Sequence, residues 1–451
     1  MKLTLVLIFA CIYFLMKGLE KPYYFPLAYV WLSLLYPQAF TSSFFQYFHW
    51  TAIFLVLTIF GYLASGIRLP RITPVFIAFS LFFVWIFLTT LWSSLPDVAW
   101  EKWKWASTSV LMGLLYPLIF RTRKQIELLT IIVFAAIFPH IMTAGLKSLL
   151  GGGGYGFLAT LMPAEYYLGE SSTLAAISIM MIPIGYYLAK HSLASPAILF
   201  PRLSVLGLAA CSLACMIGTS ARTGLLSLGS FLLLGIRGLR YKVAFLSFVL
   251  VAGILLSPLL TDAWVQRMRT IETYKVDDSA STRLAVWRWT YDFAVSHPLG
   301  GGFGAYRLSD TVPNSTGQML APGRAFHSVY FEILGEHGFV GLGLYLVVAL
   351  GSFFGFYRLS WRRDLPAHQA WIRPFSTCMF AAMVPFLVGA AFIGVAFQPF
   401  GYTFYGIYLS VLTSLKIDPS EGAVQFVPAT THHWTPPQLT AVSVSARKPR
   451  I

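Results

Sequence analysis

The chain has 451 residues, of which 57% are hydrophobic and only 11% are charged. Because soluble globular proteins carry about 25% charged residues, this composition excludes a soluble enzyme. Apolar runs close to about 20 residues recur along the whole length, as in proteins that cross a bilayer with many helices. The formal net charge of +15 is of the kind that basic cytoplasmic loops produce, so it does not indicate nucleic acid as a partner.

The predicted fold class is therefore an all-α polytopic membrane protein. About 11–13 transmembrane helices are expected, since the first and last apolar runs are short. The first run is expected to remain as a span, because Lys17 and Lys21 follow it without a clear small-residue cleavage site. The predicted spans cover residues 3–16, 22–40, 47–66, 72–93, 103–120, 126–148, 171–189, 203–219, 223–238, 242–260, 339–357, 374–397 and 401–415.

Basic residues mark one set of alternate loops, whereas the opposite loops are nearly bare of them. An excess of Lys and Arg is typical of cytoplasmic loops, so the large loop 261–338 is assigned to the periplasmic side. The predicted organisation places transmembrane helices 1–10 in residues 1–260, the periplasmic loop in 261–338 and the last spans in 339–416. Residues 417–451 are rich in Pro, Thr, Ser and His, and we expect a disordered cytoplasmic tail there.

The loop 261–338 carries seven basic residues although it lies on the bare side. Long segments are exported despite such charge, but six of the seven are arginines, whose planar fork binds phosphate oxygens in pairs. For Arg267, Arg269 and Lys275, pairing with nearby acidic residues and binding of an anion remain equally open. For Arg283 and Arg324 we favour an anion.

Two helices are predicted inside this loop. The first covers residues 279–296 and is stopped by His297-Pro298. The run G-G-G-F-G at 300–304 predicts a flexible turn, without the Lys-Ser/Thr of a nucleotide-binding loop. The second helix covers 326–337 and ends at Gly338, after which residues 339–357 extend about 28 Å, enough to cross a bilayer. His327 therefore lies at a helix start just outside the membrane.

His327 is the leading candidate for acid–base chemistry. The partial positive charge of a helix N-terminus disfavours imidazolium, so a neutral imidazole is available as a base; the alternative is a His that only caps the helix. Glu332 and Glu336 share a helix face that points away from His327, and His337 points elsewhere, so these three are expected to support the loop. A metal site built from the four residues would lack the H-E-x-x-H spacing, and no metal or other cofactor is predicted.

A further arginine, Arg222, stands in G-T-S-A-R-T-G at the outer end of a predicted span. One interpretation is a side chain that reaches to the membrane interface and binds nothing specific. The other is an arginine that binds an anionic headgroup, for which small neighbours such as Gly218 and Gly224 leave room.

Three segments together resemble the O-antigen ligase/polymerase superfamily of bacterial membrane glycosyltransferases. They are S-A-R-T-G at 220–224, T-R-L-A-V-W with H-P-L-G-G-G-F-G at 282–304, and F-H-S-V-Y-F-E-I-L-G-E-H-G-F-V-G-L at 326–342. The early P-Y-Y-F-P-L-A-Y-V-W-L-S-L-L-Y-P is similar to the O-glycosylation ligases associated with exosortase systems. Where the family usually has Asn after the histidine, this chain has Ser328, which predicts an altered acceptor contact.

The resemblance implies a GT-C-like helical fold with an outer-leaflet cavity roofed by the large loop. It implies transfer of a glycan from undecaprenyl diphosphate to a hydroxyl of a lipid or protein, without a metal, at the periplasmic face of the inner membrane. Arg222 and Arg283 would hold the diphosphate and His327 would activate the acceptor. We add Arg324 as an assisting residue and expect inversion at the sugar carbon, with membrane lipids as surroundings and no nucleic acid.

Two alternatives remain open. A polymerase would transfer the growing chain to another lipid-linked repeat, and acceptor choice of that kind lies in the shape of the cavity. A transporter of lipid-linked glycan would place charges through the depth of its spans. Here the ionisable residues gather in the outer loop, with His140 as the main exception.

Overall fold

The structure is a computed structural model of the chain. It describes residues 2–416 except 42–47, 67–68, 153, 155–157, 159–160, 163–167, 195–200, 235–241, 256, 258–259, 261, 270–277, 314–316 and 318. The predicted cytoplasmic tail, 417–451, lies outside the described residues.

The described part of the chain is almost entirely helical, which confirms the predicted all-α fold class. The α-helices are α1 (Lys2–Glu20), α2 (Tyr24–Leu35), α4 (Trp50–Ala64), α5 (Pro74–Leu91), α6 (Pro96–Ile119), α7 (Arg123–Lys147), α8 (Ser171–Lys190), α9 (Pro201–Thr219), α10 (Arg222–Leu233), α11 (Lys242–Leu255), α12 (Asp262–Arg269), α13 (Asp278–Ser296), α14 (Val329–Trp361), α15 (Ile372–Gly389) and α16 (Pro399–Ser414). Short helical turns are η1 (Pro37–Phe40), η2 (Ser148–Gly152), η5 (Ala305–Leu308) and η6 (Ala367–Gln369). Two-residue strands, β1 (Val312–Pro313) and β2 (Met319–Leu320), pair antiparallel.

Every predicted span overlaps one of these helices, and the chain is a multi-pass membrane protein. Among the described helices, six are long and apolar enough to cross a membrane, and three shorter apolar helices accompany them. The six cover Pro74–Leu91, Arg123–Gly151, Ser171–Lys190, Arg202–Thr219, Val329–Trp361 and Ala367–Gly389. The total of about 11–13 spans stays a prediction.

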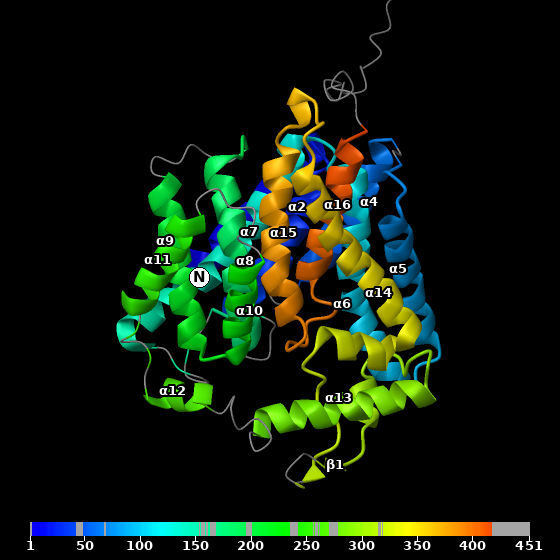
Figure 1. Ribbon diagram of the computed structural model, residues 1–451. Coiled ribbons are helices and arrows are strands. Elements are labelled where there is room, and N and C mark those ends of the chain that lie inside the picture. The colour runs from blue at the N-terminus through cyan, green and yellow to red at the C-terminus, as the bar shows by residue number, and fades with distance from the viewer. Residues whose placement is uncertain are drawn as a thin grey trace, which may run out of the picture. The chain divides into compact units, whose positions relative to one another are not determined.

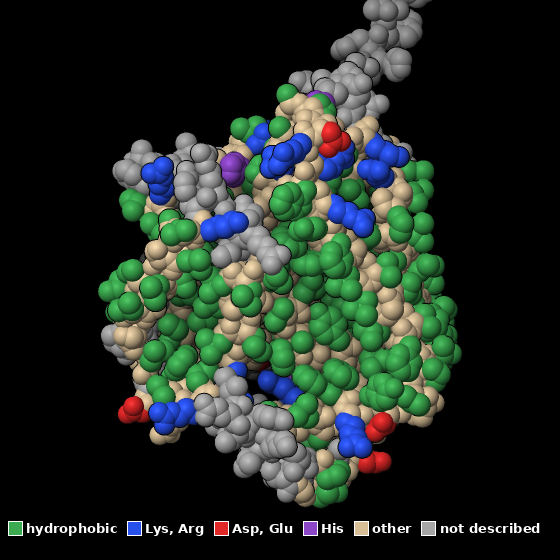
Figure 2. Space-filling model, viewed as in Figure 1, with side chains coloured by type: hydrophobic (Ala, Val, Ile, Leu, Met, Phe, Trp, Pro, Cys, Tyr) green, Lys and Arg blue, Asp and Glu red, His purple; other side chains and the backbone are tan. Residues whose placement is uncertain are grey.

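Described parts of the loops near residues 94, 154, 218 and 301, which were predicted to share the periplasmic side, lie at one end of the helices, at the bottom of Figure 1, where α12 and α13 are seen. Ser94 N donates to Gly301 O over 3.2 Å, and Gly154 N donates to Gly218 O over 2.8 Å. Many Lys and Arg side chains gather at the opposite end, at the top of Figure 2. The alternation of basic and bare loops therefore corresponds to two ends of one helical unit, and the side of the membrane that each faces stays a prediction.

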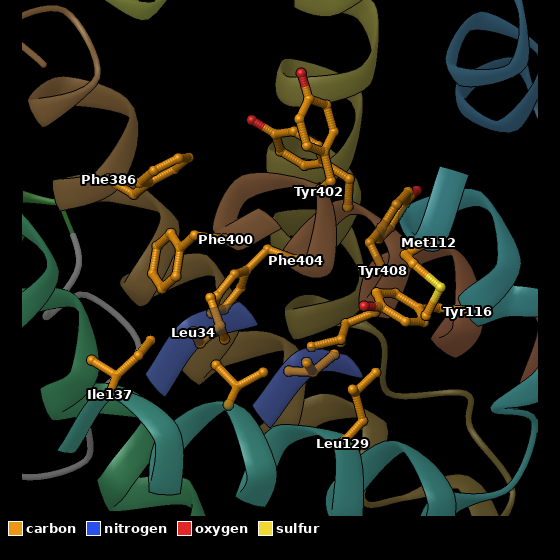
Figure 3. Close-up of a cluster of buried hydrophobic side chains, with 14 of the residues drawn as sticks. Leu34, Met112, Tyr116, Leu129, Ile137, Phe386, Phe400, Tyr402, Phe404 and Tyr408 are labelled. Atoms are coloured by element: carbon orange, nitrogen blue, oxygen red, sulfur yellow. The ribbon is translucent and has the colours of Figure 1, made fainter. Parts of the chain in front are cut away.

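Large apolar side chains fill the interior between α2, α6, α7, α15 and α16 (Figure 3). Leu34, Met112, Ile137, Phe386 and Phe404, one from each helix, are all buried. Because lipid tails are as apolar as these side chains, close packing between helices holds such a core together.

The outer helix and the following span form one element, α14, with a break at Gly338 (φ 67°, ψ −167°), the residue predicted to end the outer helix. A Cβ at Gly338 would overlap the Pro298 carbonyl oxygen, so this close approach requires glycine. α14 begins at Val329, not at the predicted residue 326, because Ser328 is its N-cap and accepts from Phe331 N over 3.5 Å.

The glycine run 300–304 is a buried, hydrogen-bonded turn, and the prediction of a flexible turn is wrong. Gly301 N donates to Gly335 O over 3.1 Å, and Gly302 N donates to Glu336 O over 2.8 Å. These carbonyls lose their helical partners where α14 breaks, so the turn supplies the missing donors. The run therefore fixes the outer part of α14.

The predicted span 374–397 is also wrong at its end, because α15 stops at Gly389. Residues 390–398 are largely apolar, and the predicted span therefore included most of them. In the structure they form a non-helical segment that packs against the start of α14. Ala390 O accepts from Val329 N over 2.9 Å, and Phe397 is fully buried. This segment brings α15 to the candidate site.

Candidate functional site

His327 lies in a stretch of chain that is fixed on both sides. Phe326 is 3% exposed, and its carbonyl accepts a hydrogen bond from Trp287 Nε1 of α13 over 2.8 Å. Two residues beyond His327, Val329 is held by Ala390. Between these anchors His327 adopts a φ of 48°, a left-handed conformation that costs a non-glycine residue about 1–2 kcal/mol. Strain that the surroundings enforce in this way is characteristic of functional sites.

Four charged side chains act electrostatically on His327, two of them from distant segments and two from its own part of the chain. They are Arg283 of α13, Glu170 at the N-cap of α8, Glu332 of α14 and Arg324. Figure 2 shows Lys and Arg side chains in a hollow above α13, below the apolar surface of the helices. The structure thus brings together residues that lie far apart in the sequence.

The His327 imidazole is open to solvent but has protein on most sides. Partial desolvation lowers the pKa of His327, and the positive charge of Arg283 lowers this pKa further. The imidazole is therefore neutral at neutral pH and can accept a proton. The sequence predicted a neutral His from the helix dipole, whereas the larger causes are desolvation and a neighbouring arginine.

Arg222 is the first residue of α10 and is half-buried. It follows Ser220, whose φ of 51° reverses the chain and whose carbonyl accepts from Arg267 Nε over 3.1 Å. Arg267 thus binds a backbone oxygen close to Arg222 in the sequence. For Arg267 the sequence had left open pairing with an acidic residue or binding of an anion, and a backbone carbonyl was not among these alternatives. Lys275 lies outside the described residues, and Arg269 is exposed.

The glycines near Arg222 are used for helix packing, and the expectation that they leave room for a ligand is wrong. A Cβ on Gly218 would overlap the Ser148 hydroxyl, and one on Gly224 would lie 2.6 Å from Met216 Cγ. Close contact between helices in membranes depends on small residues of this kind.

Arg222 and His327 approach the same end of α15. A Cβ on Gly389 would lie 3.8 Å from Thr223 Cγ2, the residue next to Arg222. Ala390 then receives the hydrogen bond from Val329. The two candidate residues are therefore linked through the last residues of α15.

Arg324 is exposed and lines a small recess with Ser309, Asp310 and Trp289. Its charge also lowers the pKa of His327, but less than the charge of Arg283 does. This position suits an assisting residue at the edge of the site.

Glu332 and Glu336 bind one lysine that the sequence did not single out, Lys102 of α6. Lys102 Nζ lies 2.7 Å from Glu332 Oε1 and 2.8 Å from Glu336 Oε1. The exposed fractions of the three side chains are 16%, 11% and 0% in the order Lys102, Glu332, Glu336. The rings of Phe303 and Phe397 lie 5.4 and 5.2 Å from Nζ, so the ion pairs are shielded from water.

The same carboxylates bind backbone N–H groups of two further segments, of which 390–398 lies beside His327. Glu336 Oε1 accepts from Gly304 N over 2.8 Å, and Glu332 Oε2 accepts from Ala396 N over 3.3 Å. The cluster thus joins α6 and α14 to the turn 300–304 and to the segment 390–398. In these contacts lysine and backbone N–H groups are the donors, and the supporting role of the two glutamates stays a prediction.

His337 points into the protein, away from the site. Its side chain is fully buried, its Nδ1 lies 2.6 Å from Thr89 Oγ1, and its carbonyl accepts from Trp85 Nε1 over 2.8 Å. Among the described residues, no three His, Cys, Asp or Glu side chains are grouped as metal ligands would be.

Residues 207–346 match the family described as O-Antigen ligase. The match covers less than half of the chain and supports the O-antigen ligase superfamily for this segment. The matched segment holds the candidate residues Arg222, Arg283, Arg324 and His327. Residues 2–193 match a second family, which is described as one of unknown function. A search of curated proteins finds no match.

The buried ion pairs join the two matched segments. Glu332 and Glu336 lie in the O-antigen ligase match, whereas Lys102 lies in the segment of unknown function. A signal for Lys102 exists in the sequence, because it is a basic residue in a loop that should be bare of them. Because the predicted span begins at residue 103, Lys102 is the last residue of this loop, where a basic residue is easily taken for the end of a span.

Ser328 is a buried residue at the start of α14. It is 1% exposed, and its hydroxyl is engaged in capping α14. The structure therefore gives the Ser328 side chain a structural role as the N-cap of α14, and an altered acceptor contact at this residue stays a prediction.

Proposed function

We propose that the protein moves an oligosaccharide from a polyprenyl-diphosphate donor, undecaprenyl diphosphate, to a hydroxyl of a lipid or protein acceptor. The family match supports glycosyltransferase-type ligase chemistry in the membrane. The feature that supports the site most directly is that the positive charge of the Arg283 guanidinium acts on the His327 imidazole and, together with desolvation, lowers the pKa of His327. A proton acceptor and a phosphate-binding cation are the two groups that this transfer needs. We place the site at the periplasmic face of the bacterial inner membrane.

The proposed reaction is a single displacement at the anomeric carbon. The acceptor oxygen forms a new bond to this carbon while the bond from the carbon to the diphosphate oxygen breaks. His327 takes the hydroxyl proton, and the diphosphate leaves with the electron pair of the broken bond. Attack opposite the leaving group inverts the carbon, and Arg222 and Arg283 neutralise the diphosphate without a metal ion.

Purified protein with a lipid-linked donor tests this function directly. The proposal expects glycan on a lipid or protein hydroxyl and release of polyprenyl diphosphate. Product on another lipid-linked repeat would identify a polymerase, and movement of intact donor across vesicles without glycan transfer would identify a transporter. The similarity of the first span region to exosortase-associated ligases stays a prediction, which a protein acceptor in this assay would support.

Replacing Arg222 with lysine should impair transfer strongly. Lysine keeps the positive charge but loses the two-pronged donor, so we expect kcat/KM for the lipid-linked donor to fall about tenfold to a hundredfold. Arg269→Lys, an exposed substitution in α12, is the matched control and should change kcat/KM little. Unchanged kinetics for Arg222→Lys would show that the Arg222 side chain extends to the membrane interface without binding the donor.

Transfer should persist to unusually acidic pH and then disappear. Desolvation and Arg283 lower the pKa of His327, so the base stays neutral at pH values at which an ordinary His, with a pKa of about 6.5, would be protonated. The acid limb of the kcat/KM profile should therefore lie below about pH 6.5.

Glu170→Gln should move this acid limb to still lower pH. The negative charge of Glu170 raises the pKa of His327, and glutamine removes the charge while keeping an oxygen that can accept from Thr173 N. Glu101→Gln, at an exposed position, serves as the control. A limb that stays in place or moves to higher pH would contradict the assignment of His327 as the base.

A further inference from the structure

A cavity of about 560 Å³ lies at the other end of α14, away from His327, and is bounded by α5, α14 and α16. Pockets of roughly 300–1,000 Å³ commonly hold small ligands. Val75, Phe354, Leu412 and Leu415 contribute apolar wall, and Arg71 and Arg358 contribute charge. The candidate site contains none of these residues.

Arg71 and Arg358 line this cavity together with Tyr408. Both positive charges act on the hydroxyl of Tyr408, which also lines it. Within the described residues, neither Arg71 nor Arg358 forms an ion pair. Arg362 at the same cavity differs, because its Nη2 lies 2.6 Å from Asp364 Oδ2. Two guanidinium groups without a carboxylate, beside a hydroxyl donor, form a site for phosphate oxygens.

The surroundings indicate that this phosphate belongs to a lipid. Phe354 is 52% exposed and nearby Ile72 is 66% exposed, so apolar side chains continue from the cavity onto the outer surface of the helices. In a multi-pass membrane protein that surface meets acyl chains. A free phosphate ion would use the arginines but would leave the apolar walls uncovered.

We propose that this cavity binds the headgroup of an anionic glycerophospholipid, with an acyl chain along its apolar wall. Arg71 and Arg358 bind the phosphate, and the Tyr408 hydroxyl donates to it. Basic pockets between transmembrane helices are suited to such headgroups. The site is separate from the proposed glycan donor site and does not depend on that function.

The proposal is tested by native mass spectrometry of the purified full chain in detergent, with phosphatidylglycerol as the probe. The double substitution Arg71→Gln, Arg358→Gln should raise the apparent Kd at least about tenfold, because charge-assisted hydrogen bonds are lost. Arg363→Gln removes an exposed arginine from the same end that does not line the cavity, and it should change the Kd less than about twofold. Phosphatidylcholine should bind more weakly than phosphatidylglycerol, and an equal concentration of inorganic phosphate should not displace the lipid.

A second variant distinguishes lipid binding in this cavity from attraction of the lipid to positive charge on the surface. Leu412→Trp keeps every arginine and fills the apolar wall, so it should also weaken phosphatidylglycerol binding. Normal binding by either cavity variant would overturn the proposal, as would an equal loss in Arg363→Gln or equal binding of phosphatidylcholine. Displacement by inorganic phosphate would overturn the lipid assignment and identify a site for free anions.

Discussion

Replacing His327 with alanine is expected to abolish glycan transfer while the protein stays folded in the membrane. Loss of a general base typically lowers the rate about 10²–10⁴-fold. Because His327 is exposed and its ring forms no hydrogen bond within the described part of the chain, the free energy of unfolding should change little. kcat with a saturating lipid-linked donor is the measurement, since His327 is assigned to the acceptor and not to donor binding.

His327→Asn distinguishes the loss of the proton acceptor from a disturbance of the left-handed backbone at this position. Asparagine tolerates the left-handed φ of 48° at this position better than alanine does, and it keeps hydrogen-bonding groups but cannot take up a proton near neutral pH. It should be as inactive as His327→Ala. His297→Ala, at an exposed position at the end of α13, is the matched control and should retain activity. Full activity in either His327 variant would sink the assignment.

Replacing Lys102 with methionine is expected to lower both stability and activity. The substitution leaves two carboxylates facing each other, one of them fully buried, and breaking a buried ion pair costs about 3–5 kcal/mol. The loss in activity has a geometric cause, because Glu332 and Glu336 hold the segments at Ala396 and Gly304. We expect a lower unfolding temperature and a lower kcat.

The control for this substitution lies outside the ion-pair cluster, and the rescue lies within it. Lys104→Met changes an exposed lysine two residues away and should leave the unfolding temperature nearly unchanged. Lys102→Met combined with Glu332→Gln and Glu336→Gln removes all three charges and should recover part of the lost stability. If Lys102→Met were as stable as Lys104→Met, the cluster would not hold the site together.

The order of the helices followed from the sequence because a bilayer leaves few choices. Backbone groups in lipid must be satisfied internally, so long apolar runs become helices. The predicted span 171–189, for example, is α8 (Ser171–Lys190). The same rule failed at 390–398, because hydropathy does not distinguish an apolar helix from an apolar loop that is buried within protein.

The sequence also identified His327, Arg222 and Arg283 from residue type and resemblance, although their roles remain proposals. It misjudged the local structure around them. The run 300–304 contains four glycines, a composition typical of flexible turns, yet its N–H groups bind carbonyls of α14. No local pattern reveals a hydrogen-bond partner that lies in a distant segment.

What the sequence by itself determined was the membrane class, the order of apolar helices, the break at Gly338 and the resemblance to the O-antigen ligase superfamily, which the family match over residues 207–346 supports. These depend on local composition and motifs. Only the tertiary structure decided that Lys102 pairs with Glu332, 230 positions away, and that Arg283 and desolvation keep His327 neutral. Burial and charge proximity are properties of the folded chain, so the electrostatics of the site arise only when the helices pack.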